Sequence, residues 1–140
     1  MNVETVMTKK VFTVRMDDTI GTIREILRTV PFHHLLVVEG RKLVGILSDR
    51  DILKKISPFL ESLSETERDL TILNRKVHQI MTRKPITVDK NTNVEDAASL
   101  LLDNNISCLP VTTPDGEILG VVTLKDILKL YVMREKKTTK

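Results

Sequence analysis

The sequence predicts an α/β (α+β) fold of two β-α-β-β-α repeats, packed sheet to sheet about a pseudo-twofold axis and joined by a helical linker. Two observations lead to this prediction. Residues 45–53, GILSDRDIL, return as residues 120–128, GVVTLKDIL. The pairs Met7-Thr8 and Thr13-Val14 return 74 residues later as Met81-Thr82 and Thr87-Val88. Because a half of about fifty residues buries a sheet face poorly, we expect the two halves to pack together.

Each repeat begins with a short apolar stretch, residues 11–14 or 85–88, followed by a helix. The first helix is expected to start at Thr19 as its N-cap and the second at Asn93. Apolar residues at helical spacing follow each cap. They are Ile20, Ile23, Leu27 and Val30 in the first repeat, and Val94, Ala97, Ala98 and Leu101 in the second.

Two strands and a closing helix complete each repeat. The strands read LLVV and KLVGIL in the first repeat, and LPVT and ILGVVT in the second. The turn between them contains Gly40 or Asp115-Gly116, which predicts a hairpin. The closing helices are expected over residues 49–56 and 124–133.

The repeats divide the chain into three predicted parts: a first domain at residues 1–56, a linker at 57–76, and a second domain with a basic tail at 77–140. Within the linker, Pro58 suits a first helical position, and Ser64 with Glu67 forms a capping box. An apolar row predicts a helix that packs on its own module or on a partner. The row consists of Leu70, Leu73, Val77 and Ile80.

Composition limits the classes of function. Hydrophobic residues make up 41% of the chain, but the three Phe, one Tyr and no Trp leave few rings to stack on bases. Nucleic-acid binding is therefore not favoured. No apolar run reaches the roughly 20 residues of a membrane span, and the lone Cys108 fits a reducing compartment, so we expect a cytoplasmic protein.

The basic character of the chain is concentrated at its end. Residues 134–140, REKKTTK, carry four basic groups and one acidic group, which equals the net charge of +3 for the whole chain. We expect a frayed, solvated tail, and a small electrostatic arm is the alternative.

The repeated stretch has two physical interpretations. Ser48 with Asp51, and Thr123 with Asp126, have the [ST]-x-x-[DE] spacing of a helix capping box, which stabilises a helix by about 1 kcal/mol. The same turn could also bind a nucleotide, since a helix N-terminus attracts phosphate and a carboxylate accepts hydrogen bonds from a ribose diol. A neighbouring basic side chain, that of Arg50 or Lys125, would add positive charge.

The stretches VMTKKVFTV, GILSDRDIL, IMTRKPITV, NNISCLPV and GVVTLKDIL together resemble tandem CBS domains, the pair known as a Bateman module. The resemblance covers residues 3–133 except the linker. It implies two clefts between the halves, each able to take an adenosine compound such as AMP, ADP, ATP or a related cofactor. The chain departs from the family pattern at Leu36, where such domains usually have proline, as at Pro110.

By this resemblance, each cleft draws residues from both halves. In each cleft the aspartate would hold the ribose hydroxyls, the serine or threonine the phosphate, and apolar side chains the adenine. One cleft would combine Ser48, Arg50, Asp51, Thr82, Ile86, Thr87, Ile106 and Ser107. The other would combine Thr123, Lys125, Asp126, Thr8, Phe12, Thr13, Phe32 and His33.

The chain carries no nucleophile elbow, Walker loop or H-E-x-x-H sequence, so it is predicted not to be an enzyme and to need no catalytic cofactor. His33 and His34 are neighbours on a strand and point to opposite faces, which argues against a shared metal ion. Cys108 starts an apolar strand and is expected in the core.

The favoured function is an adenosine-nucleotide sensor whose packing changes when its ligand binds. It is expected to form a homodimer and to regulate a separate, unidentified protein. Two alternatives from other classes stay open. One is a ligand-independent interaction or dimerisation adaptor, and the other is a nucleic-acid-binding protein.

Overall fold

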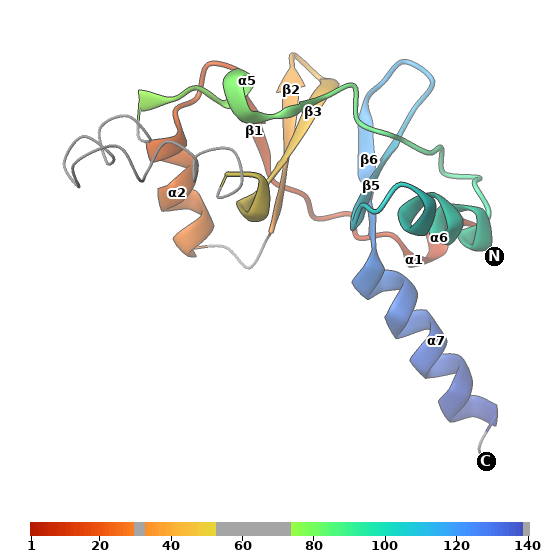
Figure 1. Cartoon of the computed structure of the whole chain (residues 1–140). Coiled ribbons are helices and arrows are strands. Elements are labelled where there is room, and N and C mark those ends of the chain that lie inside the picture. Colours follow the sequence, from red (N-terminus) through yellow and green to blue (C-terminus); the bar gives the residue numbers. More distant parts are fainter. Residues whose placement is uncertain (30–32, 53–73, 139–140) are drawn as a thin grey trace. The chain divides into compact units, whose positions relative to one another are not determined.

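A computed structural model gives the structure of the chain and describes residues 1–29, 33–52 and 74–138 (Figure 1). The chain forms two compact units. The early unit comprises residues 12–85, and the late unit comprises residues 1–11 together with residues 86–140. Sheets and helices occur in both units, so the predicted mixed α+β class is confirmed.

The early unit contains a four-stranded sheet in the order β1-β2-β3-β4. Its first strand, β1 (Thr13–Arg15), runs parallel to β2 (His34–Glu39). An antiparallel hairpin joins β2 to β3 (Lys42–Ser48), and Gly40 in its turn has a φ of +63°. The short β4 (Thr82–Arg83) completes the sheet beside β3.

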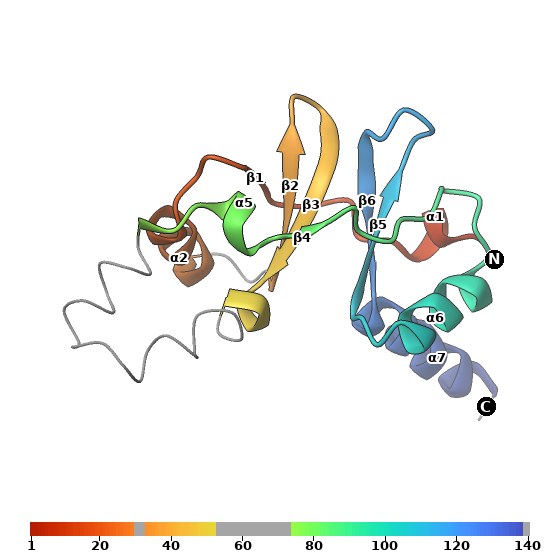
Figure 2. The same ribbon diagram turned by 45° about the horizontal axis from the view of Figure 1, so that its top comes forward.

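The late unit repeats this order with fewer regular strands. Its hairpin consists of β5 (Cys108–Thr112) and β6 (Ile118–Thr123), and Figure 2 shows it as a second hairpin like that of β2 and β3. A parallel bridge joins Val88 to Val111, and an antiparallel bridge joins Thr8 to Val121. These two bridges take the places of β1 and β4. The strand expected at residues 85–88 is therefore reduced to one bridge.

Both predicted N-caps of the first helices are confirmed. Before α2 (Ile20–Thr29), the Thr22 N–H donates to Thr19 Oγ1 over 3.3 Å. Before α6 (Val94–Asp103), the Glu95 N–H donates to Asn93 Oδ1 over 2.8 Å. Each helix buries part of its predicted apolar row in the core of its own unit.

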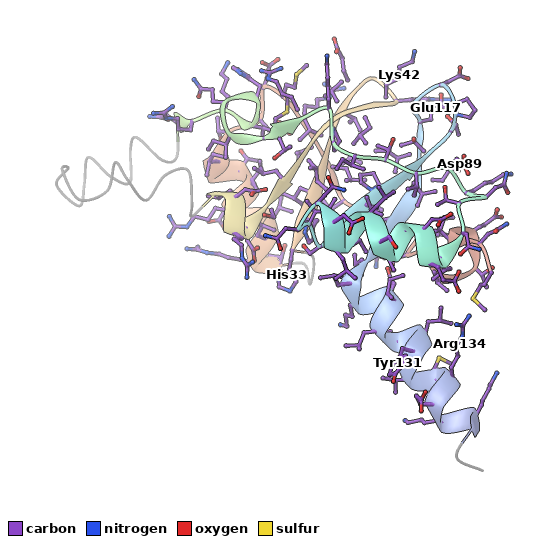
Figure 3. The ribbon with its side chains drawn as sticks, turned by 45° about the vertical axis from the view of Figure 1, so that its right-hand side comes forward. His33, Lys42, Asp89, Glu117, Tyr131 and Arg134 are labelled. Carbon is purple, nitrogen blue, oxygen red and sulfur yellow. The ribbon has the colours of Figure 1, made fainter. Side chains whose placement is uncertain are left out.

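The closing helix of the late unit is longer than expected. It is α7 (Leu124–Thr138), so the prediction of a frayed tail beyond residue 133 is wrong. Arg, Glu and Lys are good helix formers, and Lys136 and Lys137 lie in the last turn, where positive charge stabilises the helix dipole. The tail is nevertheless solvated, and Figure 3 shows Tyr131 and Arg134 projecting from this helix. In the early unit the closing helix is described over residues 49–52.

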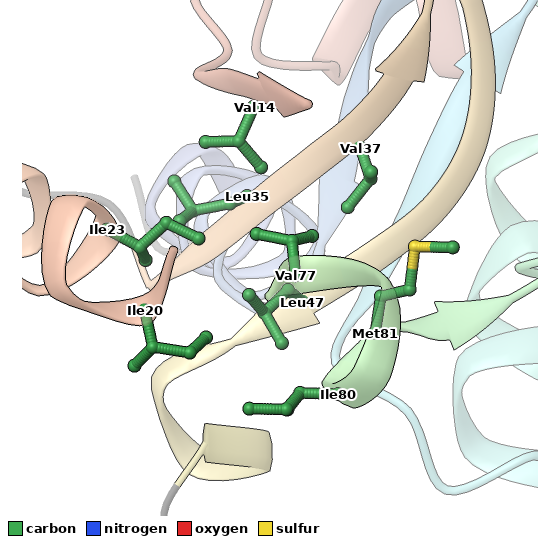
Figure 4. Close-up of a cluster of buried hydrophobic side chains, with 9 residues drawn as sticks. All are labelled: Val14, Ile20, Ile23, Leu35, Val37, Leu47, Val77, Ile80 and Met81. Atoms are coloured by element: carbon green, nitrogen blue, oxygen red, sulfur yellow. The ribbon is translucent and has the colours of Figure 1, made fainter. Parts of the chain in front are cut away.

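The linker prediction is only partly within the described residues. Pro58, Ser64, Glu67, Leu70 and Leu73 lie outside them. The end of the apolar row forms the short helix α5 (Val77–Ile80), and both of its named end residues are buried in the early unit. Figure 4 shows them within a cluster of nine buried side chains. The cluster consists of Val14, Ile20, Ile23, Leu35, Val37, Leu47, Val77, Ile80 and Met81.

The late unit has a core of its own. The helix α1 (Val3–Val6) contributes Val3, which is fully buried. Its amide donates to the Thr92 carbonyl over 2.8 Å, and the Val94 amide donates to the Met1 carbonyl over 3.0 Å. The other members of this core are Val88, Ala97, Leu101, Leu109, Val111 and Val122. The start of the chain is thus an integral part of the late unit.

The repeated glycines allow the repeated Met-Thr pairs to pass close to a strand. A methyl group on Gly45 would lie 2.6 Å from Met81 Sδ and 3.0 Å from the Thr82 carbonyl oxygen. On Gly120 it would lie 2.7 Å from the Thr8 carbonyl oxygen. Each unit therefore contains the Met-Thr opening of the other repeat. The domain boundaries at residues 56 and 77 follow the repeats in sequence and stay a prediction.

We expect Gly120→Ala to destabilise the chain by about 3 kcal/mol, because the new methyl group would press on a backbone oxygen that cannot rotate away. Gly45→Ala should cost roughly half as much, since its nearest neighbour is the end of a flexible methionine. The measurement is urea unfolding. Gly40→Asn is the control: its site is open, and asparagine tolerates the positive φ. Equal stabilities for all three variants would contradict the close passage.

Candidate functional site

The two [ST]-x-x-D turns are reciprocal capping boxes. In the late unit, the Thr123 N–H donates to Asp126 Oδ2 over 3.0 Å, and the Asp126 N–H donates to Thr123 Oγ1 over 3.2 Å. In the early unit, the Ser48 N–H donates to Asp51 Oδ2 over 3.2 Å, and the Asp51 N–H donates to Ser48 Oγ over 3.0 Å. The capping interpretation is confirmed in both repeats, and it holds each hydroxyl and carboxylate in place.

In the late unit a third residue joins the turn. The Thr8 hydroxyl donates to Asp126 Oδ1 over 3.0 Å and is 3.3 Å from Oδ2. The Thr123 hydroxyl also lies 3.1 Å from Oδ2. Thr8 is 118 residues from Asp126 in sequence, and its backbone pairing with Val121 brings it there. The structure therefore joins three residues that the resemblance assigned to one cleft.

The early unit brings the equivalent residue to the equivalent strand. Thr82 in β4 pairs with Ile46, two residues before Ser48 in β3. The Thr82 side chain is exposed, as is that of Arg50 at the start of the closing helix. Its counterpart Lys125 is also exposed. Each unit thus holds a hydroxyl, a carboxylate and a basic side chain from one repeat. It also holds a threonine from the opposite repeat.

The other predicted site residues are divided between the units. Phe12, Thr13 and His33 belong to the early unit, whereas Phe32 lies outside the described residues. The late unit contains the remaining four, and three of them have exposed side chains that a ligand could reach. The four are Ile86, Thr87, Ile106 and Ser107. Their role in holding adenine stays a prediction.

Asp49 is a residue of the early turn that the sequence reasoning missed. Its Oδ1 accepts a hydrogen bond of 2.7 Å from the Arg50 N–H, and its Oδ2 lies 3.1 Å from His33 Nδ1. The equivalent residue in the late unit is Leu124. Aligning SDRD of the first repeat with TLKD of the second would have revealed this difference in charge.

Two neighbouring groups have shifted pKa values. Burial lowers the pKa of His34 from its ordinary 6.5; the charge of His33 acts in the same direction, while Asp49 and Asp51 oppose it. Burial, with a smaller contribution from the Asp126 charge, raises the pKa of the Cys108 thiol to about 12. Cys108 is 5% exposed, so its predicted place in the core is confirmed, and its thiol is protonated at neutral pH.

In residues 1–29, 33–52 and 74–138, no three His, Cys, Asp or Glu side chains gather in a group that could hold a metal ion. No helix in this part of the chain is long and apolar enough to cross a membrane.

Sequence comparison identifies one family in both repeats. Residues 3–58 and 77–133 match the model of the CBS domain. A CBS domain-containing protein of Dictyostelium discoideum is 35% identical over 132 residues, covering 93% of this chain and 90% of that protein. An inosine-5′-monophosphate dehydrogenase of Korarchaeum cryptofilum is 33% identical over 124 residues, covering 89% of this chain but only 23% of the enzyme.

Structure comparison agrees with the sequence matches. A crystal structure of CBSX2 in complex with AMP has a TM-score of 0.79 and 28% identity, covering 96% of this chain and 98% of that one. The CBS domain pair of protein MJ0100, in complex with 5′-methylthioadenosine and S-adenosyl-L-methionine, has a TM-score of 0.81 and 27% identity, with the same coverage. These matches confirm the resemblance to tandem CBS domains.

The lowered pKa of His34 predicts a loss of stability in acid. Stability should be complete above about pH 6.5 and should fall below it, because the unfolded chain binds the proton more readily than the folded one. His34→Gln should remove this contribution, which is at most about 1.4 kcal/mol per pH unit. Urea unfolding of both proteins at about pH 7.5 and about pH 5.5 measures it. If both proteins lose the same stability between these pH values, the explanation is wrong.

Proposed function

Since the chain belongs to the CBS domain family and carries the domain twice, we propose that it is a regulatory module that binds an adenosine nucleotide, AMP, ADP or ATP, or a related adenosyl compound. One observation carries this proposal. In the late unit the hydroxyls of Thr8 and Thr123 converge on the carboxylate of Asp126, at the start of a helix. The early unit builds the equivalent turn from Ser48 and Asp51.

The chemistry of this turn suits a ribose phosphate. A carboxylate that accepts one bond of a capping box can also accept bonds from the two hydroxyls of a ribose, and such charge-assisted bonds are strong. The hydroxyl of the turn and the exposed basic side chain beside it, that of Lys125 or Arg50, can donate hydrogen bonds to a phosphate. In the late unit, the ribose would share or replace the bond that Asp126 now accepts from Thr8.

Similar proteins support the class of ligand. CBSX2 was crystallised with AMP, and the MJ0100 domain pair with 5′-methylthioadenosine and S-adenosyl-L-methionine. All of these ligands contain a 5′-substituted adenosine, and they differ in charge at the substituent. The adenosine group is therefore the common part that we assign to both sites of this chain.

Regulation of a partner is part of the same proposal. The ligand would favour one packing of the module over another, and a partner protein would bind one of these states. No catalytic step is assigned, and the protonated Cys108 thiol is a poor nucleophile at neutral pH. We also propose the cytoplasmic location that the sequence suggested.

A homodimer is supported by the exposed surface of α7. Leu128 and Tyr131 are each 61% exposed, and Leu124, Val132 and Met133 lie on the same helix with exposed side chains. Apolar side chains gathered on one surface helix are typical of a protein contact, and a second copy of the chain could cover them. The same surface would serve the second candidate function, a ligand-independent adaptor.

We expect Asp126→Asn and Asp51→Asn each to weaken AMP binding at its own site by about 10- to 100-fold, because hydrogen bonds to a charged group contribute roughly 1.5–3 kcal/mol. Asparagine keeps an oxygen that can accept the cap bond, so stability should change by less than about 1 kcal/mol. Titration calorimetry with AMP on both single variants and the double variant tests this.

The double variant separates the sensor from the adaptor. If it is folded and binds AMP with the affinity and stoichiometry of the parent, the two turns are helix caps only. If the parent binds no adenosine compound, the sensor proposal fails and the adaptor is favoured.

A further inference from the structure

We propose that Asp49 sets the ligand preference of the early unit, by weakening its binding of the phosphate groups that the late unit binds readily. The early site would then favour uncharged or cationic adenosyl compounds, and the late site phosphorylated ones. This inference rests on the proposed function, because it assigns a ligand class to each of the two turns.

Asp49 places a negative charge on the first turn of the closing helix. It directly follows Ser48, and its Oδ1 accepts the Arg50 N–H over 2.7 Å. Its Oδ2 is 3.1 Å from Nδ1 of His33, the residue that directly precedes β2. The carboxylate therefore occupies an N–H that a bound anion would otherwise use.

The late unit has no such carboxylate. Leu124 takes the place of Asp49, and its backbone N–H donates to the Ser107 carbonyl over 3.1 Å. The Asp49 N–H makes the matching bond to the His33 carbonyl over 3.2 Å, so the two backbones agree. The next N–H, that of Lys125, lies in the turn where a helix leaves its donors without intrahelical acceptors. An incoming phosphate could accept from it.

The other charges of the two described turns and of the Met-Thr segments beside them correspond. Lys125 corresponds to Arg50, and the capping aspartates correspond to each other. Thr8 is followed by Lys9-Lys10, and Thr82 by Arg83-Lys84, so two basic residues follow each Met-Thr pair. Among these residues, Asp49 in the early unit and Leu124 in the late unit are therefore the pair that differs in formal charge.

The effect on a ligand follows from like-charge repulsion. AMP would bring its phosphate beside the Asp49 carboxylate, whereas adenosine has no charge at that position. Two like charges about 5 Å apart near a protein surface, partly screened by salt, reduce affinity by roughly 10- to 100-fold. The ratio of AMP affinity to adenosine affinity therefore measures the effect of the Asp49 charge on phosphate binding.

The experiment isolates each site and compares the two probes. In Asp126→Asn the early site remains, and in Asp51→Asn the late site remains. Calorimetry with AMP and with adenosine, at about pH 8, where histidine is ordinarily neutral, should show that the late site prefers AMP by at least about 10-fold. The early site should show no such preference.

Adding Asp49→Asn to the Asp126→Asn protein should raise AMP affinity by about 10-fold and leave adenosine affinity unchanged. The matched control is Glu39→Gln, which removes the same charge at the far end of β2. Glu39 pairs with Lys42, whereas His34 at the other end pairs with Ser48. Five residues of strand separate these ends by about 17 Å, beyond the screening length of physiological salt. This control should not change the ratio.

The reverse exchange keeps the test decisive if Asp49→Asn fails to fold. Leu124→Asp in the Asp51→Asn protein should lower AMP affinity by about 10-fold and leave adenosine affinity unchanged. If both probes bind but neither exchange changes their ratio, Asp49 has no role in selection and the proposed function stands. If neither probe binds to the parent protein, the proposed function fails, and this inference fails with it.

Discussion

The close passage of each Met-Thr pair over a strand glycine is the constraint on which the rest of the structure depends. A methyl group at Gly120 would approach the Thr8 carbonyl oxygen to 2.7 Å, and one at Gly45 would meet Met81 and Thr82. Because these positions carry no side chain, the start of the chain can pair with β6 and residues 82–83 can pair with β3. The same pairing brings the Thr8 hydroxyl to the Asp126 carboxylate. A packing requirement thus also assembles a candidate ligand site.

The helix caps and the proposed binding sites use the same atoms, and these two roles are compatible. A capping box restricts the rotamers of its hydroxyl and its carboxylate, so less entropy is lost when a ligand binds them. Asp126 also accepts a bond from Thr8, which a ribose would have to share or displace. Occupation of the late site would therefore act on the start of the chain, since Thr8 pairs with Val121 and Val3 lies in the same core. This connection offers a physical route from ligand binding to a change in packing.

Much of the fold could be predicted because it is local and repeated. The caps at Thr19 and Asn93, the two hairpins and the capping boxes at Ser48 and Thr123 follow from short-range patterns. The assignment of Thr8 to the Asp126 turn came from a family resemblance, since 118 residues separate the two in sequence. Periodicity did not reveal that each opening joins the unit of the other repeat, because that pairing is non-local. The length of α7 was underestimated because its last turns have no apolar row. Asp49 was missed because it is a charge difference, against Leu124, within a stretch that is otherwise alike in the two repeats.

The most direct test of the central claim is a ligand screen by thermal unfolding of the parent chain. Adenosine, AMP, ATP and S-adenosylmethionine would be compared with GMP as the guanine control. A ligand at about 100 times its dissociation constant stabilises the folded state by about 2.7 kcal/mol, which is readily detected in a chain of this size. The account predicts a clear rise in melting temperature with at least one adenosine compound and none with GMP. No shift with any adenosine compound, or an equal shift with GMP, would contradict it.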